Sequence, residues 1–393
     1  MVAGHLQEKN GHFYIVLSYK DENGKRHTPW FPTKLPVKGN KKRAEAMLLD
    51  MRQNFQPVLT VEVIPAEEPA EKGIPFVDFL QQWLRVAKST IKTTTYSSYV
   101  GMVNKPIIPH FRSTGILLEN LTSKDLQDFY TLQLERVSPN TVIHYHAVIH
   151  RALKYAVKMD MIPVNPADKI ERPKKDQFVG SFYDSNEMNA LFKCIEGTPF
   201  EVPIKLGAFY GLRRGEILGL KWDAIDFDAN TITIRHTVTS CNLNGKHIEV
   251  VSDSAKTKSS MRTLPLVPVF RELLLQKKKD QQRYQKLCGR SYCTDYQEYV
   301  CVNQIGERIK PNCLSDSFKQ ILTNNGLRMI RLHDLRHSCA SLLLANGVPM
   351  KQIQEWLGHS DFSTTANIYA HLDYQSKLSS ADAMLSGLGM NTV

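Results

Sequence analysis

The chain has 393 residues, roughly two to three times the usual size of a domain, so several domains and a large buried core are expected. Hydrophobic residues make up 42% of the chain and charged residues 23%, which excludes a wholly disordered protein. The sequence contains no apolar run long enough to cross a membrane, and its polar opening has no apolar signal-peptide centre. Membrane insertion and secretion are therefore not expected.

The charge balance indicates a polyanionic partner. Lys and Arg number 50 against 39 Asp and Glu, and the net charge of +11 favours nucleic acid. Residues 1–60 carry ten basic and five acidic groups, and residues 76–175 carry fourteen and eight. The seven cysteines are spread singly between Cys194 and Cys339, a pattern that predicts a reducing, cytoplasmic compartment with neither a disulfide framework nor a metal site.

The first 60 residues predict a small basic sheet with one helix. Gly11–Tyr19 is β-prone, Asp21–Gly24 is a hairpin-turn signal, and Lys25–Phe31 can form the returning strand. Lys41–Arg52 contains strong helix formers, with an apolar stripe at Ala44, Met47, Leu48 and Met51. Residues 61–75, with three prolines and four glutamates, are typical of an extended linker.

Residues 76–168 predict a module of four helices. Helical periodicity begins at Phe76. A second helix can begin at Thr93–Tyr96 and a third at Thr122–Phe129. Ser138–Thr141 can cap a long fourth helix that runs to about Met159. This fourth helix combines an apolar stripe with basic and histidine side chains. Its polar face is interpreted either as a solvated surface or as a phosphate-contacting one. The expected DNA-binding residues, here and in the first module, are Lys92, Arg151, Lys154, Lys158, Lys41, Lys42 and Arg43.

A second linker is expected at residues 169–180, followed by a mixed helix and strand domain over residues 181–393. Leu206–Leu220 is compatible with a helix, on which Arg213 and Glu216 share a face. One interpretation is an ordinary surface ion pair without a functional role. The alternative is that Glu216 orients Arg213 toward an anion.

The next segment predicts strands. Asn230–His236 alternates in the manner of a strand, and a hairpin-like region covers Val250–Leu266. Lys256 and Lys258 lie on the turn of that region. A lysine in this position is either a solvated loop charge or a group that reaches DNA.

The last part of the domain predicts two helices with polar residues at their ends. A helix beginning in Ile330–Ser338 places His333 and Arg336 side by side, although Asp334 equally suits a capped structural helix. Asn346-Gly347 ends that helix, and Val348–Leu357 forms another that is closed by Gly358-His359. Tyr369 follows ten residues later.

Five motifs in this order resemble the tyrosine recombinases, specifically the integrases of Gram-positive phages and conjugative transposons. The motifs are Gly211-Leu-Arg-Arg-Gly-Glu216, Lys256-Thr-Lys-Ser-Ser-Met-Arg262, His333-Asp-Leu-Arg-His337, Leu357-Gly-His359 and Ile368-Tyr-Ala-His371. The resemblance implies an α+β multidomain fold: an N-terminal sheet-plus-helix domain, an all-α four-helix domain, and a mainly α catalytic domain with a small antiparallel sheet.

The resemblance also implies the site and the reaction. Arg213 and Arg336 would form the arginine clamp, with Glu216 as a supporting residue and His333 and His359 as the histidine members. Lys256 would be the loop lysine, with Lys258 as the alternative, and Tyr369 would be the nucleophile. Arg214 has no implied role. Fixed cations neutralise the phosphate in such chemistry, so neither a metal nor another cofactor is expected.

The implied partners are DNA attachment sites of two kinds, arm sites for residues 1–60 and core sites for residues 76–168. Four copies of the chain are expected on DNA in the bacterial nucleoid, with an excisionase and a host DNA-bending protein. The tail after His371 either docks on a neighbouring copy or folds back on its own domain. Two other functions remain open, a topoisomerase-like enzyme and a DNA-binding regulator with vestigial catalytic residues.

Overall fold

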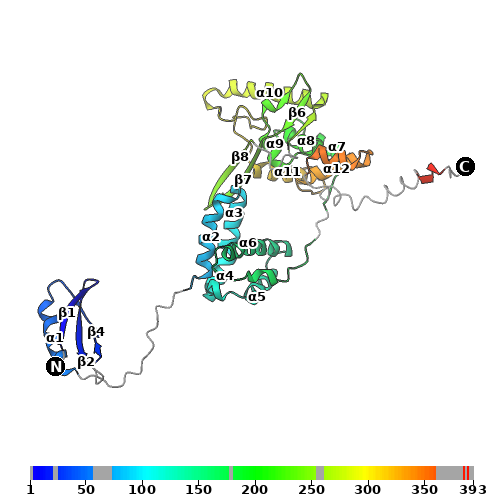
Figure 1. The fold of residues 1–393 in the computed structure, drawn as a ribbon. Coiled ribbons are helices and arrows are strands. Elements are labelled where there is room, and N and C mark those ends of the chain that lie inside the picture. Colours follow the sequence, from blue (N-terminus) through cyan, green and yellow to red (C-terminus); the bar gives the residue numbers. More distant parts are fainter. Residues whose placement is uncertain are drawn as a thin grey trace. The chain divides into compact units, whose positions relative to one another are not determined.

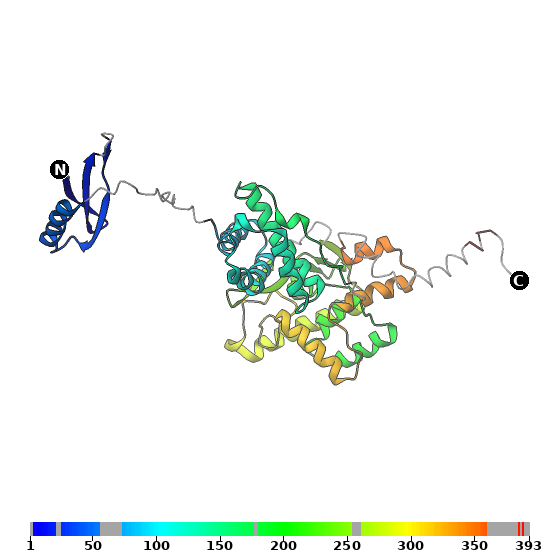
Figure 2. The same ribbon diagram turned by 90° about the horizontal axis from the view of Figure 1, so that it is seen from below.

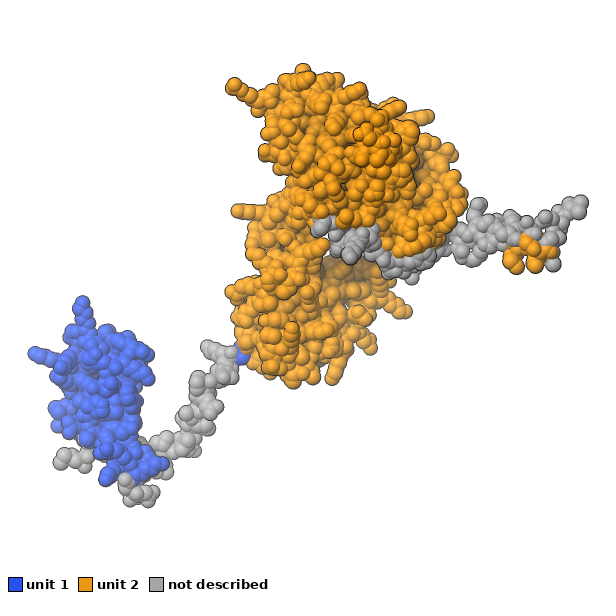
Figure 3. Space-filling view, turned by 45° about the horizontal axis from the view of Figure 1, so that its top comes forward, with its two compact units in different colours: residues 1–73 blue, residues 74–393 orange. Residues whose placement is uncertain are grey.

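The computed structural model describes residues 3–20, 25–55, 73–176, 180–253 and 261–359, and residues 384, 385, 387 and 388 near the C-terminus. Within these ranges no helix is both long and apolar enough to cross a membrane. The chain divides into two compact units, residues 1–73 and residues 74–393, which have separate colours in Figure 3.

The first unit is a small antiparallel sheet with a helix against it (Figure 1). Its elements are β1 (Ala3–Lys9), β2 (His12–Lys20), β3 (Arg26–His27), β4 (Trp30–Pro36) and α1 (Lys41–Asn54). The central strand β2 pairs with the other three strands. Alternate β2 residues such as Phe13 and Ile15 are buried, as is Ala44 of α1. The predicted sheet and helix are confirmed, but Met47 of the expected apolar stripe is 43% exposed. The predicted turn at residues 21–24 lies outside the described residues.

The second unit begins with a helical bundle, which is seen from below in Figure 2. Its elements are α2 (Phe76–Thr90), α3 (Thr93–Met102), the π-helical segment η1 (Val103–Ile107), α4 (Ile108–Thr114), η2 (Leu118–Asn120), α5 (Ser123–Leu134), α6 (Pro139–Lys158) and η3 (Pro166–Lys169). The predicted four helices are present because α3, η1 and α4 follow one another without a break. Pro106 lies in the π-helical segment, where the Ile108 amide donates to the Val103 carbonyl.

Local capping signals fix where two of these helices begin. Thr122 and Asp125 form a capping box at the start of α5. The Ser138 hydroxyl caps α6, whose first residue is Pro139, as the sequence predicts. The apolar stripe of α6 is buried, and so is His146, one of the histidines of this helix. The expected basic residues Arg151, Lys154 and Lys158 are exposed on α6.

The remainder of the second unit is mainly helical and contains two small antiparallel sheets. Its helices are α7 (Ser185–Ile195), α8 (Glu201–Phe209), α9 (Arg214–Gly219), η4 (Trp222–Ala224), α10 (Pro268–Cys288), η6 (Gly289–Ser291), α11 (Pro311–Asn324), α12 (Asp334–Ala345) and α13 (Met350–Leu357). Its strands are β5 (Ile225–Asp226), β6 (Thr231–Ile234), β7 (Thr237–Leu243), β8 (Lys246–Ser252) and β9 (Arg262–Pro265). The predicted fold class is confirmed.

Two local predictions for this region are wrong. Leu206–Leu220 is not one helix, because α8 ends at Phe209 and α9 begins at Arg214. The region Val250–Leu266 is not a hairpin, since β8 pairs with β7 whereas β9 pairs with β6. The segment that contains Lys256 therefore connects two different sheets. Strand pairing of this kind depends on distant partners that a local alternation pattern does not identify.

The β7–β8 hairpin extends from this region to the helical bundle (Figure 1). The Ser97 hydroxyl of α3 donates to the Asn242 carbonyl of β7 over 2.7 Å. The expected linker at residues 169–180 lies within the second unit, and the domain boundary placed there remains a prediction.

Gly219, at the end of α9, offers a test of this packing. A Cβ atom there would lie 2.6 Å from the Thr237 Cα and 2.7 Å from the His236 carbonyl oxygen, both of them backbone atoms. Gly219→Ala should therefore lower the free energy of unfolding by about 2 kcal/mol or more. The matched control is Gly101→Ala on α3, where no atom lies within 4 Å of the added Cβ. The control should be neutral or slightly stabilising, and equal urea midpoints for the two variants would contradict the packing described here.

Candidate active site

The site begins at a break between two helices. Gly211 adopts a positive φ of 62°, which favours glycine, and a Cβ there would lie 2.3 Å from the Leu357 Cδ2. The chain therefore turns after α8 and restarts as α9, with Arg213 as the residue before its first turn. The Arg213 amide donates to the Glu216 Oε2 over 3.0 Å, so Glu216 caps the helix from its first turn.

Glu216 is the buried carboxylate of the site. Its side chain is only 4% exposed, and it forms ion pairs with Arg213 at 2.7 Å and with Arg262 at 3.0 Å. Arg262 comes from the start of β9 and is 6% exposed, whereas Arg213 is 37% exposed. The interpretation as a surface ion pair is therefore wrong. Because a buried carboxylate needs paired partners, Glu216 fixes the two guanidinium groups beside it.

Arg336, on the first turn of α12, is also buried. Its Nη1 donates to the Gly211 carbonyl and its Nη2 to the Leu357 carbonyl, both over 2.6 Å. Its Nε donates to the His359 Nε2 over 3.2 Å. The helix break at Gly211 and the end of α13 thus supply the carbonyls that hold Arg336 in place.

His359 follows the last turn of α13. Gly358 closes that helix in the left-handed conformation, as the sequence predicts. The backbone carbonyl of His359 accepts from the Gln354 Nε2 over 3.2 Å, which ties the residue back to the helix. Since the His359 Nε2 accepts a hydrogen bond from Arg336, a neutral ring carries its proton on Nδ1.

The charges of this cluster do not balance. Among the described residues, Arg213, Arg262 and Arg336 surround one carboxylate, that of Glu216. Burial would raise the pKa of Glu216, but the charges of Arg262, Arg213 and Arg336 and the Arg262 hydrogen bond hold it below its usual value. Burial and the charge of Arg213 lower the pKa of Arg336. The surplus of positive charge makes the cluster suited to an anion.

Both expected histidines are neutral at neutral pH. Burial, followed by the charges of Arg336 and Arg213, lowers the pKa of His359 to about 3. Desolvation, followed by the charges of His337 and Arg336, lowers the pKa of His333 to about 4. The His333 and His337 rings meet edge to face at 5.3 Å. Neutral imidazoles can accept a proton or donate one hydrogen bond without adding to the positive charge.

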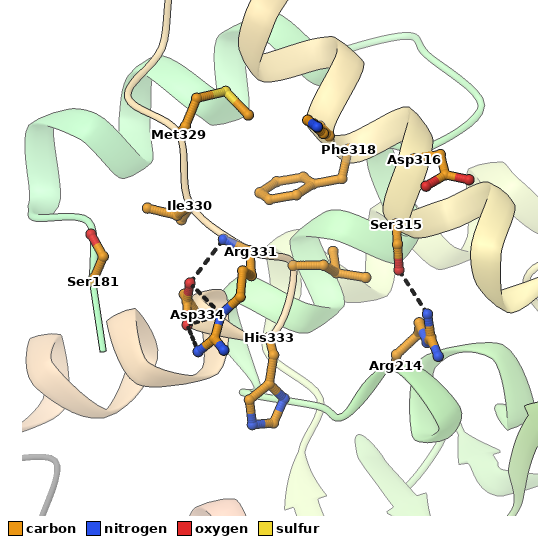
Figure 4. Close-up of a pocket in the computed structure, with 12 residues that line it drawn as sticks. Ser181, Arg214, Ser315, Asp316, Phe318, Met329, Ile330, Arg331, His333 and Asp334 are labelled. Atoms are coloured by element: carbon orange, nitrogen blue, oxygen red, sulfur yellow. Dashed lines mark hydrogen bonds and ion pairs between the residues drawn. The ribbon is translucent and has the colours of Figure 1, made fainter. Parts of the chain in front are cut away.

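His333 lies at the edge of a cavity of about 830 Å³. Figure 4 shows its ring directed away from Phe318 and Met329, which line the cavity. On another side of the cavity Arg214 donates to the Ser315 hydroxyl over 2.9 Å. Arg214 therefore faces α11 rather than Glu216, in agreement with its lack of an implied role.

The structure brings together Arg213, Glu216, Arg336 and His359. His333 is the N-cap residue of α12, three residues before Arg336, and its backbone carbonyl accepts from the Arg336 amide over 3.1 Å. Lys256, Lys258 and Tyr369 lie outside the described residues. Arg262 was not among the site residues expected from the sequence, although it belongs to the cluster. The signal that could have identified it is its position, because it is the last residue of the lysine motif and the first residue of the following strand β9.

The residues expected to bind DNA from the other modules are exposed. Lys92 precedes α3, and Lys41, Lys42 and Arg43 lie on the first turn of α1. Arg151 donates to the Tyr99 hydroxyl over 3.3 Å. Their contact with DNA remains a prediction. Among the described residues, no group of three or more His, Cys, Asp or Glu side chains is arranged to hold a metal ion.

Comparison with known proteins identifies the family. The phage integrase family profile matches residues 182–376, which contain every motif of the site. The chain belongs to the phage integrase family. A second profile, the N-terminal SAM-like domain of phage integrases, matches residues 75–132.

The chain is 27% identical to a tyrosine recombinase XerC-like protein of Caldanaerobacter subterraneus, a match that covers 96% of this chain and 97% of that protein. It is 25% identical to the ICEBs1 integrase of Bacillus subtilis, over 89% and 91% of the two chains. The predicted class, a tyrosine-type site-specific recombinase of Gram-positive mobile elements, is confirmed.

Solved structures share the fold. A Tn1549 transposon integrase in complex with transposon right end DNA has a TM-score of 0.65 at 18% identity, covering 78% of this chain and 98% of that one. A lambda integrase tetramer bound to a Holliday junction has a TM-score of 0.54 at 16% identity, covering 91% and 95%.

The neutral state of His359 predicts a pH dependence of stability. Its pKa is near 3 in the folded chain and about 6.5 in the unfolded chain, so the unfolded state binds more protons as the pH falls below 6.5. Stability is therefore lost toward acid. His359→Gln keeps an acceptor for Arg336 but does not titrate. Between about pH 6 and 5 the free energy of unfolding of the variant should therefore fall less steeply than that of wild type, and the two slopes should differ by about 1 kcal/mol per pH unit.

Urea denaturation at several pH values in this window measures the two slopes. This pH window lies above the usual pKa range of carboxyl groups, so Glu216 and the other carboxylates contribute little to the slope. Identical slopes in wild type and His359→Gln would mean that His359 binds its proton equally well in the folded and the unfolded chain.

Proposed function

We propose that this recombinase cleaves and rejoins DNA through a 3′-phosphotyrosyl intermediate, and thereby integrates and excises a mobile element. The observation that carries the proposal is the cluster of Arg213, Arg336 and His359, which has more positive charge than Glu216 neutralises. A phosphodiester supplies the missing negative charge. Its nonbridging oxygens accept the planar, paired hydrogen bonds that guanidinium groups donate.

The proposed step begins with attack of the Tyr369 hydroxyl oxygen on the scissile phosphorus. A bond forms between the tyrosine oxygen and phosphorus, and the bond between phosphorus and the 5′ oxygen breaks. The phenolic proton passes to His333, and the 5′ oxygen leaves with a proton from Lys256, or from Lys258 as the alternative. The nearby phosphate anion raises the pKa of His333 from its low value in the free chain, which favours this transfer.

The arginines stabilise the charge that develops on phosphorus during this step. Arg336 is held by two carbonyls and His359, so little reorganisation accompanies the binding of the phosphate. Arg213 is the more exposed of the two and can approach from the open side of the cluster. The covalent bond to Tyr369 preserves a phosphoester, so the hydroxyl of a second strand can reverse the step without ATP or a metal.

The proposed DNA contacts follow the order of the modules. Residues 1–60 would bind arm sites, with Lys41, Lys42 and Arg43 as candidates. Residues 76–168 would bind the core site through Lys92 and the basic face of α6. Four copies would act on two duplexes in the bacterial cytoplasm, at the nucleoid, together with an excisionase and a host DNA-bending protein. The tail after His371 would dock on a neighbouring copy.

Tyr369→Phe tests the nucleophile. The variant should bind DNA with the wild-type dissociation constant and form no covalent adduct on a nicked suicide substrate, because phenylalanine has no attacking oxygen. Tyr284→Phe, a change on α10, is the matched control and should form the adduct at the wild-type rate. Denaturing gels with labelled DNA in EDTA provide the measurement. Adduct formation by Tyr369→Phe would refute the assignment, and wild-type activity that requires added Mg²⁺ would refute the metal-free step.

Deletion of residues 1–60 tests the division of labour between the modules. If these residues bind separate arm sites, the shortened chain should cleave an isolated core site at nearly the wild-type rate and lose protection of flanking DNA in a footprint. A footprint on the complete attachment site that is unchanged by the deletion would reject the arm-binding role. Strand exchange between two duplexes separates recombination from a topoisomerase-like activity, which would relax DNA without a partner.

A further inference from the structure

Three arginines hold the end of α13. The carbonyls in the last turn of a helix have no partner within the helix, and they form the negative end of its dipole. Here each of three successive carbonyls accepts from a different arginine: Trp356 from the Arg262 Nε at 2.8 Å, Leu357 from the Arg336 Nη2 at 2.6 Å, and Gly358 from the Arg213 Nη2 at 3.3 Å. The end of this helix therefore sets the position of all three guanidinium groups.

Arg262 differs from the other two in where its charge is directed. Its side chain is 6% exposed, and its guanidinium bonds to both oxygens of Glu216, to Oε2 at 3.0 Å and to Oε1 at 3.4 Å. Arg213, by contrast, keeps 37% of its side chain exposed. The guanidinium group of Arg262 is thus directed at its protein neighbours, whereas that of Arg213 is accessible from the open side of the cluster.

Glu216 links these two arginines. Its Oε1 accepts from the Arg213 Nη1 at 2.7 Å, while its Oε2 accepts from Arg262 and from the Arg213 backbone amide. Without Arg262, the buried carboxylate would have Arg213 as its nearest cation. Its attraction would then turn the Arg213 guanidinium toward both carboxylate oxygens and away from a substrate.

We propose that Arg262 is a positioning residue, which through Glu216 and the end of α13 holds the Arg213 guanidinium in the orientation that receives a nonbridging oxygen of the scissile phosphate. This inference rests on the proposed function and assigns a role to a residue outside the expected set. Arg262 itself touches no substrate in this account. Its loss should slow the chemical step while DNA binding, which involves many phosphates, changes little.

The test compares two suicide substrates, one with a normal scissile phosphate and one with a methylphosphonate in its place. Methylphosphonate lacks the negative charge, so it depends less on a correctly aimed arginine. Arg262→Gln should cleave the phosphate substrate about 100-fold more slowly than wild type at saturating DNA, the size of effect that a small misplacement causes. The ratio of its methylphosphonate rate to its phosphate rate should rise at least about tenfold over the wild-type ratio.

Two further variants separate positioning from folding. Arg262→Lys keeps a charge beside Glu216, but an ammonium cannot reproduce the forked bonds to Glu216 and Trp356, so the same rise in the ratio is expected. Arg308→Gln is the matched control, because Arg308 is another buried arginine, paired with Glu249 and lying against Tyr296 and Tyr299. It should lower the melting temperature without changing the ratio.

The outcomes distinguish this inference from the proposed function. Absence of an adduct between wild type and the phosphate substrate would overturn the proposed function itself. If wild type forms the adduct, two results would overturn the positioning role alone. One is cleavage of the phosphate substrate by Arg262→Gln at the wild-type rate. The other is a ratio of methylphosphonate rate to phosphate rate that is no higher in both Arg262 variants than in wild type. An equal rise of the ratio in Arg308→Gln would also overturn it, since the effect would then follow from general destabilisation.

Discussion

The site depends on the burial of one carboxylate among three arginines. Glu216 can remain charged at 4% exposure only because Arg213 and Arg262 pair with it. Those arginines, and Arg336, are in turn bonded to carbonyls at the end of α13. The start of α9, the start of β9, the first turn of α12 and the end of α13 therefore meet at one point, although they are far apart in the sequence. A change in any of these four elements would therefore disturb the hydrogen bonds that position the arginines.

This arrangement prepares the cluster for a phosphate before DNA arrives. Among the residues that the structure describes, three guanidinium groups and one carboxylate leave a positive surplus. Both histidines stay neutral because burial and the arginines oppose their protonation. A bound phosphodiester would relieve the repulsion among the arginines and raise the pKa of the histidines. The same anion would thus complete the electrostatics of the cluster and make its proton acceptor more basic. Fixed cations can in this way take the part that a metal ion plays in other phosphoryl transfers.

Much of this could be predicted from the sequence where the signal is local. Capping residues such as Thr122 and Ser138 fix helix starts, and Gly358 fixes a helix end, because each acts on its own turn. The order of the motifs selected Arg213, Glu216, Arg336 and His359 correctly as neighbours. Periodicity missed the break at Gly211, since one residue in the left-handed conformation does not alter an apolar pattern. It also missed the partners of β8 and β9 and the role of Arg262, which are decided by contacts between distant segments.

The most direct test of the central claim is a structure of the full chain trapped covalently on nicked attachment-site DNA. The account predicts that the phosphorus is bonded to the Tyr369 oxygen and that guanidinium nitrogens of Arg213 and Arg336 lie about 3 Å from its nonbridging oxygens. His333 and His359 should lie at the rim of the same site. A phosphorus attached to another residue, or a trapped phosphate that neither arginine contacts, would contradict it.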